Sequence, residues 1–277
     1  MSCTKIGIIL ATIVCVIVLS PALKGTIFGS WRIPFFLGGI ISFGALYMRF
    51  SLKESNIFHG VKKESNLVSY PFFYLIFFNF KSLLKGTGLG FFIISMLFFY
   101  ALLPEILYLF YDFNKLFVFF IVNVSCIVSI TVTVLSGYII DKYKLQKIYF
   151  FPTGCILMIL MTPVISYLIF YSNNVAFVSA YIILGILNGI SCSSYFSLTT
   201  ELFEPYIRFT GISVSFTAAV IFGGSAIPFV ADSLISKTNP AYVVAVTVII
   251  AMIISLIAAW WIYFSSNKYK TGKNEII

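Results

Sequence analysis

Residues 136–147 have the sequence SGYIIDKYKLQK and form a short charged stretch between two long apolar runs. The stretch holds Asp141, Lys142, Lys144 and Lys147, in a chain that is 60% hydrophobic and only 10% charged. A segment with this density of charge cannot lie in hydrocarbon, because each buried charge is costly there. It therefore fixes one point of the chain in water, from which the neighbouring runs can be placed.

The apolar runs are long enough to cross a bilayer as helices. Mean hydropathy is +1.04, whereas about a quarter of the residues in soluble domains are charged. A spanning helix needs about 20 apolar residues, and none of the runs alternates as a barrel strand would. We therefore expect an all-α integral membrane protein. Its eight expected spans are residues 6–23, 33–50, 89–111, 116–140, 148–171, 175–198, 209–234 and 241–264.

The basic residues predict the orientation of these spans. With Lys5 in the cytoplasm, fourteen of the eighteen Lys and Arg residues fall on the cytoplasmic side. Lys and Arg gather in cytoplasmic loops of membrane proteins. We therefore expect a multi-pass protein of the inner (plasma) membrane with both termini in the cytoplasm. The other side receives four basic residues: Lys24, Arg32, Lys115 and Lys237.

A polar connection divides the chain into parts. We expect two helices in residues 1–50, a cytoplasmic loop over residues 51–88, a six-helix bundle over residues 89–264 and a cytoplasmic tail over residues 265–277. The second half of the loop, residues 67–84, is aromatic and apolar. It is interrupted by a proline, an asparagine and a lysine, which favours a helix lying in the membrane interface. The alternative is a ninth span, which would invert the charge pattern that follows.

Composition and spacing exclude several function classes. The net charge of +9 follows from the loops of a membrane protein, so we expect no nucleic-acid partner. The five cysteines show no paired spacing, and His59 is the single histidine, so we expect no disulfide frame and no metal site. No Gly-rich phosphate loop is present, and no nucleophile is paired with a histidine or a second acid. We therefore expect neither a cofactor nor an enzyme.

Few polar side chains enter the expected spans. Glu105, in the stretch LLPEILYLF, is a candidate proton site or counter-ion. The alternative is that Glu105 lies at the outer interface beside Asp112. Asn123 and Asn188 either line a hydrated cavity or form hydrogen bonds between helices.

Small residues recur at helical spacing inside the expected spans. Such residues let two helices approach closely, so we expect them at helix contacts. A direct contact with a ligand is the alternative for the same positions. The residues are Gly185 and Gly189, Gly211 and Ser215, and Gly223 and Gly224.

Three motifs, in the same order and spacing, resemble those of one transporter family. GYIIDK at residues 137–142 resembles the loop GxxxD(R/K)xGRR of the major facilitator superfamily, between its eighth and ninth helices. TELFEPYIRFTG at residues 200–211 resembles the ELFPTRVRYTG stretch of its metabolite:proton symporters, proline/betaine transporters among them. WRIPF at residues 31–35 and ESNIF at residues 54–58 resemble patterns around its sixth helix. By this match the eight spans are similar to helices five to twelve of twelve.

The resemblance implies a set of residues at a cytoplasmic gate and shows where the chain departs from the family. Lys144 stands where the loop motif has a glycine, and Leu145 and Gln146 follow in place of its arginines. In the second motif the proline is displaced to Pro205, and Tyr206 replaces an arginine. The implied gate residues are Gly137, Asp141, Lys142, Glu201, Arg208 and Gly211.

The resemblance also implies a function. It predicts a truncated major facilitator fold that carries a small solute, such as proline, betaine or an organic acid, in symport with a proton. Its expected partners are the lipid bilayer, the solute, the proton and a separately encoded segment with the first four helices, because the family binds solute between two six-helix halves. The alternative from another class is a non-transporting membrane remnant or scaffold.

Overall fold

The computed structural model describes residues 2–18, 32–51, 70–111, 113–171, 173–225, 229, 233 and 238–274. The chain divides into two compact units, Met1–Leu67 and Val68–Ile277. Every regular element in the described residues is a helix. The expectation of an all-α protein is therefore confirmed.

The first unit contains two helices. Helix α1 spans Ser2–Val18 and helix α2 spans Arg32–Ser51, and the two pack against each other. Both lie within the region where the sequence predicts two spans. Of the motif WRIPF, residues 32–35 belong to α2, and Trp31 is not among the described residues.

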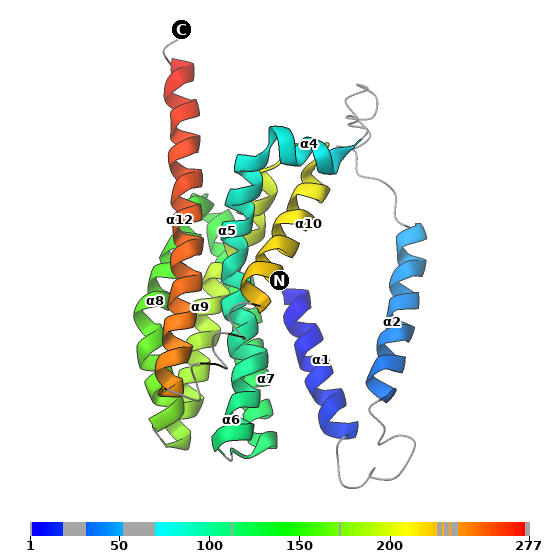
Figure 1. Ribbon diagram of the computed structural model, residues 1–277, viewed down its shortest axis with the longest axis vertical. Helices are drawn as coiled ribbons and strands as arrows, with labels where there is room; N and C mark the ends of the chain where they lie inside the picture. The colour runs from blue at the N-terminus through cyan, green and yellow to red at the C-terminus, as the bar shows by residue number, and fades with distance from the viewer. Residues whose placement is uncertain are drawn as a thin grey trace. The chain divides into compact units, whose positions relative to one another are not determined.

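The second unit contains the longer part of the chain and is drawn in Figure 1 from cyan to red. Helix α4 is short and is followed at once by a long helical run of α5, the π-helical segment η3 and α6. Helix α10 likewise continues into a π-helical segment, η4. The elements are α4 (Pro71–Phe78), α5 (Phe80–Leu97), η3 (Phe98–Leu102), α6 (Leu103–Tyr111), α7 (Lys115–Lys142), α8 (Lys147–Tyr171), α9 (Asn174–Glu201), α10 (Arg208–Ala219), η4 (Val220–Ser225) and α12 (Pro240–Asn274).

Helices occur in all eight expected spans. Within the described residues, six helical runs are long and apolar enough to cross a membrane, and two apolar helices are shorter. The shorter ones are Cys3–Val18 and Arg208–Gly224, and residues 19–31 and 226–228 lie outside the described part. The continuous apolar runs thus form helices, because only a helix satisfies its own backbone hydrogen bonds in lipid.

The first span of the second unit begins earlier than expected. The sequence places its start at Leu89, whereas α5 begins at Phe80 and includes Lys81 and Lys85. The helix accommodates Lys85 because its Nζ donates to Ser265 Oγ at 2.8 Å and lies 5.3 Å from the ring centroid of Trp261. The partner helix α12 therefore provides polar contacts that the sequence pattern does not reveal.

Small residues bring the helices of this unit close together. A Cβ on Gly185 would lie 2.7 Å from the backbone oxygen of Ser125, and one on Gly189 would lie 2.7 Å from Val132 Cβ. Both contacts join α9 to α7, so the prediction of close approach is confirmed for this pair. Gly224 is different, since the nearest atom to its added Cβ belongs to its own helical segment.

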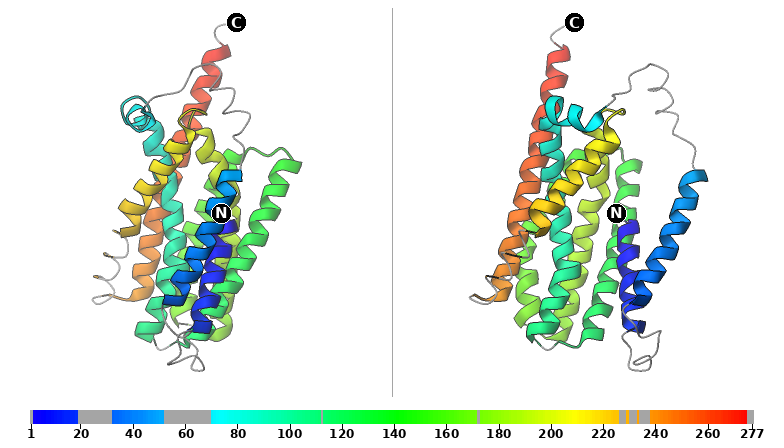
Figure 2. Two further views of the ribbon diagram at one scale, coloured as in Figure 1. Left: turned by 90° about the vertical axis from the view of Figure 1, so that its right-hand side faces the viewer. Right: turned by 45° about the vertical axis from the view of Figure 1, so that its right-hand side comes forward.

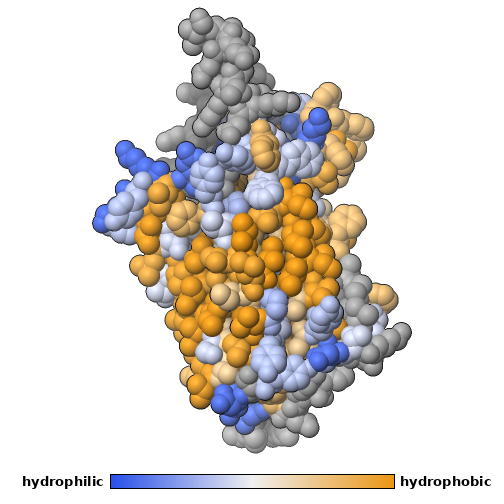
Figure 3. Space-filling view, turned by 90° about the vertical axis from the view of Figure 1, so that its left-hand side faces the viewer, coloured by the Kyte–Doolittle hydropathy of each residue, from blue (hydrophilic) through white to orange (hydrophobic). Residues whose placement is uncertain are grey.

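The two ends of the second unit differ in their polar residues. One end carries α4 and the turns 143–146 and 202–207, and we call it the α4 end; the opposite end, where α6 terminates, is the α6 end (Figure 1). At the α6 end, Asn114 and Asn173 accept hydrogen bonds from the first backbone N–H groups of α7 and α9. Figure 3 shows a broad hydrophobic band between hydrophilic ends, as expected for a bilayer-spanning surface.

Candidate functional site

The turn 143–146 ends α7 with a left-handed residue. Leu145 N donates to Ile140 O at 3.0 Å and Lys144 N donates to Asp141 O at 3.4 Å, which is the Schellman pattern. Lys144 has φ of 50° and is the single non-glycine residue with positive φ in the described part of the chain. This is the position at which the motif has glycine, so the motif glycine has a backbone role that Lys144 takes over here.

The other residues of the first motif lie on the surface of α7. Asp141 and Lys142 are exposed, and Lys142 Nζ lies 5.6 Å from the ring centroid of Tyr138. A Cβ added to Gly137 would meet no described atom within 4 Å. The motif glycine at 137 therefore borders open space within the described structure, unlike the glycines that pack α7 against α9.

The second motif builds the turn between α9 and α10. Ser197 Oγ donates to Glu201 Oε1 at 3.2 Å, and Arg208 Nε donates to Phe203 O at 3.3 Å. A Cβ on Gly211 would lie 2.5 Å from Phe203 Cδ1. Glycine at 211 thus makes room for the ring of Phe203. Arg208 binds the backbone carbonyl group of Phe203.

Helix α4 packs on this turn, a contact that the sequence analysis missed. Leu75 on α4 is fully buried in a cluster with Phe203 and Ile207. Tyr74 Oη lies 3.4 Å from Tyr206 Oη, and their ring centroids are 6.0 Å apart. The spacing of Tyr74 and Leu75 within an aromatic run gave no signal of this partner, because the two segments are far apart in sequence.

Tyr206 is the residue that replaces a motif arginine. A hydrogen bond with Glu204, and a second with Tyr74, raise the pKa of Tyr206 above its ordinary value. Both interactions favour the protonated phenol. The substitution therefore exchanges a permanent positive charge for a neutral group that links α4 to the turn.

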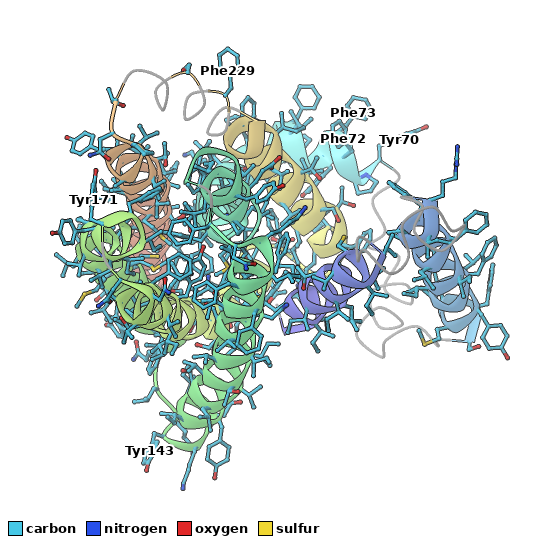
Figure 4. The ribbon with its side chains drawn as sticks, turned by 90° about the horizontal axis from the view of Figure 1, so that it is seen from below. Tyr70, Phe72, Phe73, Tyr143, Tyr171 and Phe229 are labelled. Atoms are coloured by element: carbon cyan, nitrogen blue, oxygen red, sulfur yellow. The ribbon has the colours of Figure 1, made fainter. Side chains whose placement is uncertain are left out.

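The structure does not bring the two motifs together into one site. The first motif lies at the end of α7 and the second lies between α9 and α10, beside α4. Figure 4 shows Tyr143 at one margin of the molecule and Tyr70, Phe72 and Phe73 at the opposite margin. Both motifs share the α4 end, as expected, but they contact different neighbours.

Glu105 is exposed on α6, in its first turn. It lies six residues from the end of that helix, which corresponds to about 9 Å along the axis. One turn further, the ring centroid of Tyr108 lies 4.9 Å from Lys115 Nζ. Glu105 is therefore exposed and lies one helical turn before the Tyr108–Lys115 contact, whereas Asp112 lies outside the described residues.

Asn188 lies in a buried polar cluster between helices. Ser129 Oγ on α7 donates to Asn188 Oδ1 at 3.1 Å, and Asn188 is 1% exposed. Next to this pair, Ser125 Oγ lies 3.2 Å from Tyr100 Oη of η3. Asn188 Nδ2 has no hydrogen-bond partner among the described residues. Asn123, in contrast, is half-buried on α7.

The remaining polar candidates form no catalytic or metal-binding group within the described residues. His59 and Asp232 lie outside the described residues. In the part of the chain that the structure describes, no group of three or more His, Cys, Asp and Glu side chains could hold a metal ion. The described site thus consists of charged turns and neutral hydrogen-bonding groups.

Comparison with known proteins gives one family match. Residues 3–219 match the sequence model described as Major Facilitator Superfamily. The chain is 28% identical over 237 residues to a protein of Staphylococcus aureus (strain COL) named "Putative proline/betaine transporter", covering 82% of this chain and 50% of that protein. It is also 28% identical over 222 residues to the inner membrane metabolite transport protein YhjE of Escherichia coli (strain K12), covering 76% and 48%.

The lengths of these proteins differ from that of the chain. The chain spans about half the length of the curated relatives that it matches. No solved structure matches it.

Proposed function

Since the chain belongs to the major facilitator superfamily, we propose that it works in secondary active transport of a small solute such as proline, betaine or an organic acid. The observation that carries this proposal is the family match over residues 3–219 together with helices that can span a bilayer. The names of the similar proteins suggest the class of solute. Transport moves the solute without a chemical reaction, so we assign no catalytic residue.

We propose that the solute is carried in symport with a proton. Glu105 is the candidate for the proton site, because it is an accessible carboxyl group on a helix of the bundle. We assign the lining of the solute path to Asn123 and Asn188. The unpartnered Nδ2 of Asn188 supports this assignment, because an amide N–H in a buried position is a ready donor for a carboxylate.

We propose that the α4 end faces the cytoplasm and forms the gate. The bundle from α5 to α12 would rock against the other half of the transporter, as in the family. The gate contacts with the other half would form in only one of the two states of the transporter. The residues that make them would be Asp141 and Lys142 at the end of α7, and Glu201 and Arg208 around the turn 202–207. Gly137 and Gly211 would allow close approach of the backbone at those contacts.

The relatives are about twice as long, so transport by this chain requires further helices. We propose that these helices are supplied by another segment, separately encoded or continuous with this sequence, in the same inner membrane. The test is uptake of radiolabelled proline and betaine into cells that produce the chain, with and without the first-half helices of a relative. Uptake that depends on both parts supports transport. A chain that reaches the membrane, associates with the segment and still gives no uptake of either solute would rule out transport of proline and betaine, as the scaffold alternative predicts.

The proton role of Glu105 has its own test. We expect Glu105→Gln to abolish uptake driven by a proton gradient while leaving the amount of protein in the membrane unchanged, because an amide cannot carry a proton between the two faces. Asp112→Asn is the matched control, since Asp112 is the neighbouring acid in sequence, and its uptake should be unchanged. Normal uptake by Glu105→Gln would remove this residue from the mechanism.

A further inference from the structure

Helix α4 exposes aromatic side chains on the side that faces away from the bundle. We call Phe73 and Phe77 the aromatic face of α4; they are 58% and 75% exposed, and Phe72 and Phe78, on the two sides of this face, are 47% and 75% exposed. Leu75 on the opposite side is fully buried. An eight-residue helix with one buried face and four exposed phenylalanines would be unstable in water, since large exposed apolar patches require a partner.

Helix α4 runs in a different direction from the helices that can span the membrane. In Figure 1 α4 lies across the end of α5 and α10, and the left view of Figure 2 looks nearly along α4 while α5 runs lengthwise. Figure 4, which views the bundle from its opposite end, shows Phe72 and Phe73 extending outward from the helices. The aromatic rings therefore project sideways at the level where α5 begins.

We propose that the aromatic face of α4 binds the headgroup layer of the lipid bilayer. Helix α4 is followed at once by α5, where a helical run long and apolar enough to cross the membrane begins. Aromatic residues of membrane proteins concentrate at the boundary between hydrocarbon and headgroups. The exposed Lys81 and Lys144 belong to the same end of the unit, and their charge complements the phosphates of anionic lipids.

This binding would stabilise the second motif through the inner side of α4. Leu75 packs with Phe203 and Ile207, and Tyr74 contacts Tyr206. A helix held in the headgroup layer therefore holds the turn 202–207 at a fixed depth. Arg208, whose Nε donates to the Phe203 carbonyl group, is positioned through the same turn.

The lipid contact is tested by fluorescence quenching in vesicles that contain anionic lipid. The three native tryptophans, Trp31, Trp260 and Trp261, are replaced by phenylalanine, and Phe73→Trp is introduced as the single probe. We expect strong quenching by lipids brominated next to the headgroup and weak quenching by aqueous iodide. The control is Gln146→Trp in the exposed turn 143–146, which iodide should quench. If iodide quenches both probes equally, α4 does not bind lipid and the proposal is overturned.

The effect on the turn is tested by hydrogen exchange in bilayer nanodiscs. The double variant Phe73→Asp and Phe77→Asp should displace α4 from the headgroup layer and increase amide exchange over residues 203–207. Tyr143→Asp is the control, because Tyr143 is exposed at the same end but lies on the turn 143–146, away from α4. Unchanged exchange at 203–207 in the double variant would overturn the link between α4 and the turn.

Discussion

Lys144 occupies a backbone conformation that side chains with a Cβ adopt at a cost. Its φ of 50° closes the C-terminal end of α7, with Leu145 N bound to Ile140 O. A left-handed residue other than glycine loses about 1 kcal/mol relative to glycine. The family motif avoids this cost, since it has glycine here, and this chain adds a positive charge in its place.

We therefore expect Lys144→Gly to stabilise the protein by about 0.5–1 kcal/mol. Thermal unfolding in detergent micelles measures the change. The control is Lys142→Gly, which removes the same charge from the last residue of α7 and should destabilise by about 1 kcal/mol because glycine is a poor helix former. Equal effects of the two substitutions would show that charge, and not the left-handed backbone, decides stability here.

Tyr206 connects two segments by a hydrogen bond that depends on its protonation. Its pKa is raised, first by the hydrogen bond with Glu204 and then by that with Tyr74. A group whose pKa is higher in the folded state than in the unfolded state stabilises the folded state. For tyrosine this stabilisation is complete at pH values below the pKa of the unfolded chain, which is about 10. This contribution is lost as pH rises from about 10 towards the raised folded-state pKa.

The ionisation of Tyr206 is measured as the tyrosinate absorbance of the wild type minus that of Tyr206→Phe at each pH. We expect the midpoint of this difference titration to lie above the midpoint of free tyrosine. Thermal stability of the wild type should fall more steeply above pH of about 10 than that of Tyr206→Phe. The variant lacks the group whose ionisation opposes folding. A midpoint at or below that of free tyrosine would contradict the hydrogen bonds with Glu204 and Tyr74.

At the scale of elements, glycines divide into those that contact another helix and those that do not. Gly189 on α9 lies so close to Val132 and to the backbone oxygen of Ser129 on α7 that a Cβ has no room. Gly137 on α7 borders open space. Glycine at 189 therefore allows α7 and α9 to pack closely, whereas glycine at 137 serves no such contact in the described structure.

We expect Gly189→Ala to destabilise the bundle by about 1–3 kcal/mol, because overpacking forces α7 and α9 apart. Gly137→Ala should be neutral or stabilising by up to about 1 kcal/mol, because alanine has the higher helix propensity. Thermal unfolding of both variants in the same detergent measures the difference. If Gly137→Ala proves as destabilising as Gly189→Ala, a partner packs against Gly137 in the folded protein.

At the scale of the whole molecule, the distribution of charge distinguishes the ends of the second unit. Of the described basic residues in this unit, nine belong to the α4 end and one, Lys115, belongs to the α6 end. Such asymmetry is what sets the orientation of membrane proteins. The nine residues are Lys81, Lys85, Lys142, Lys144, Lys147, Arg208, Lys268, Lys270 and Lys273.

We expect introduced cysteines at opposite ends to be reached from opposite sides of the membrane. In a variant without the native cysteines, an impermeant maleimide should label Lys115→Cys on intact cells. It should label Lys144→Cys and Lys270→Cys only after the membrane is permeabilised. If Lys144→Cys and Lys270→Cys differ from each other in this assay, the orientation assigned to α12 is wrong.

The sequence alone determined the helical class, the eight apolar segments and the family. Hydrophobic length and motif order are local properties that need no partner, since each spanning helix satisfies its own backbone. It also predicted the close approach at Gly185 and Gly189, because small residues at helical spacing have few other uses in a membrane.

Only the tertiary structure decided which distant groups meet. The contacts of Lys85 with Ser265, of Leu75 with Phe203, and of Tyr74 with Tyr206 join segments more than a hundred residues apart. No local pattern encodes such pairs, because they depend on how helices pack and rotate against one another. For the same reason the start of α5 at Phe80, and the separation of the two motifs, became visible only in the folded chain.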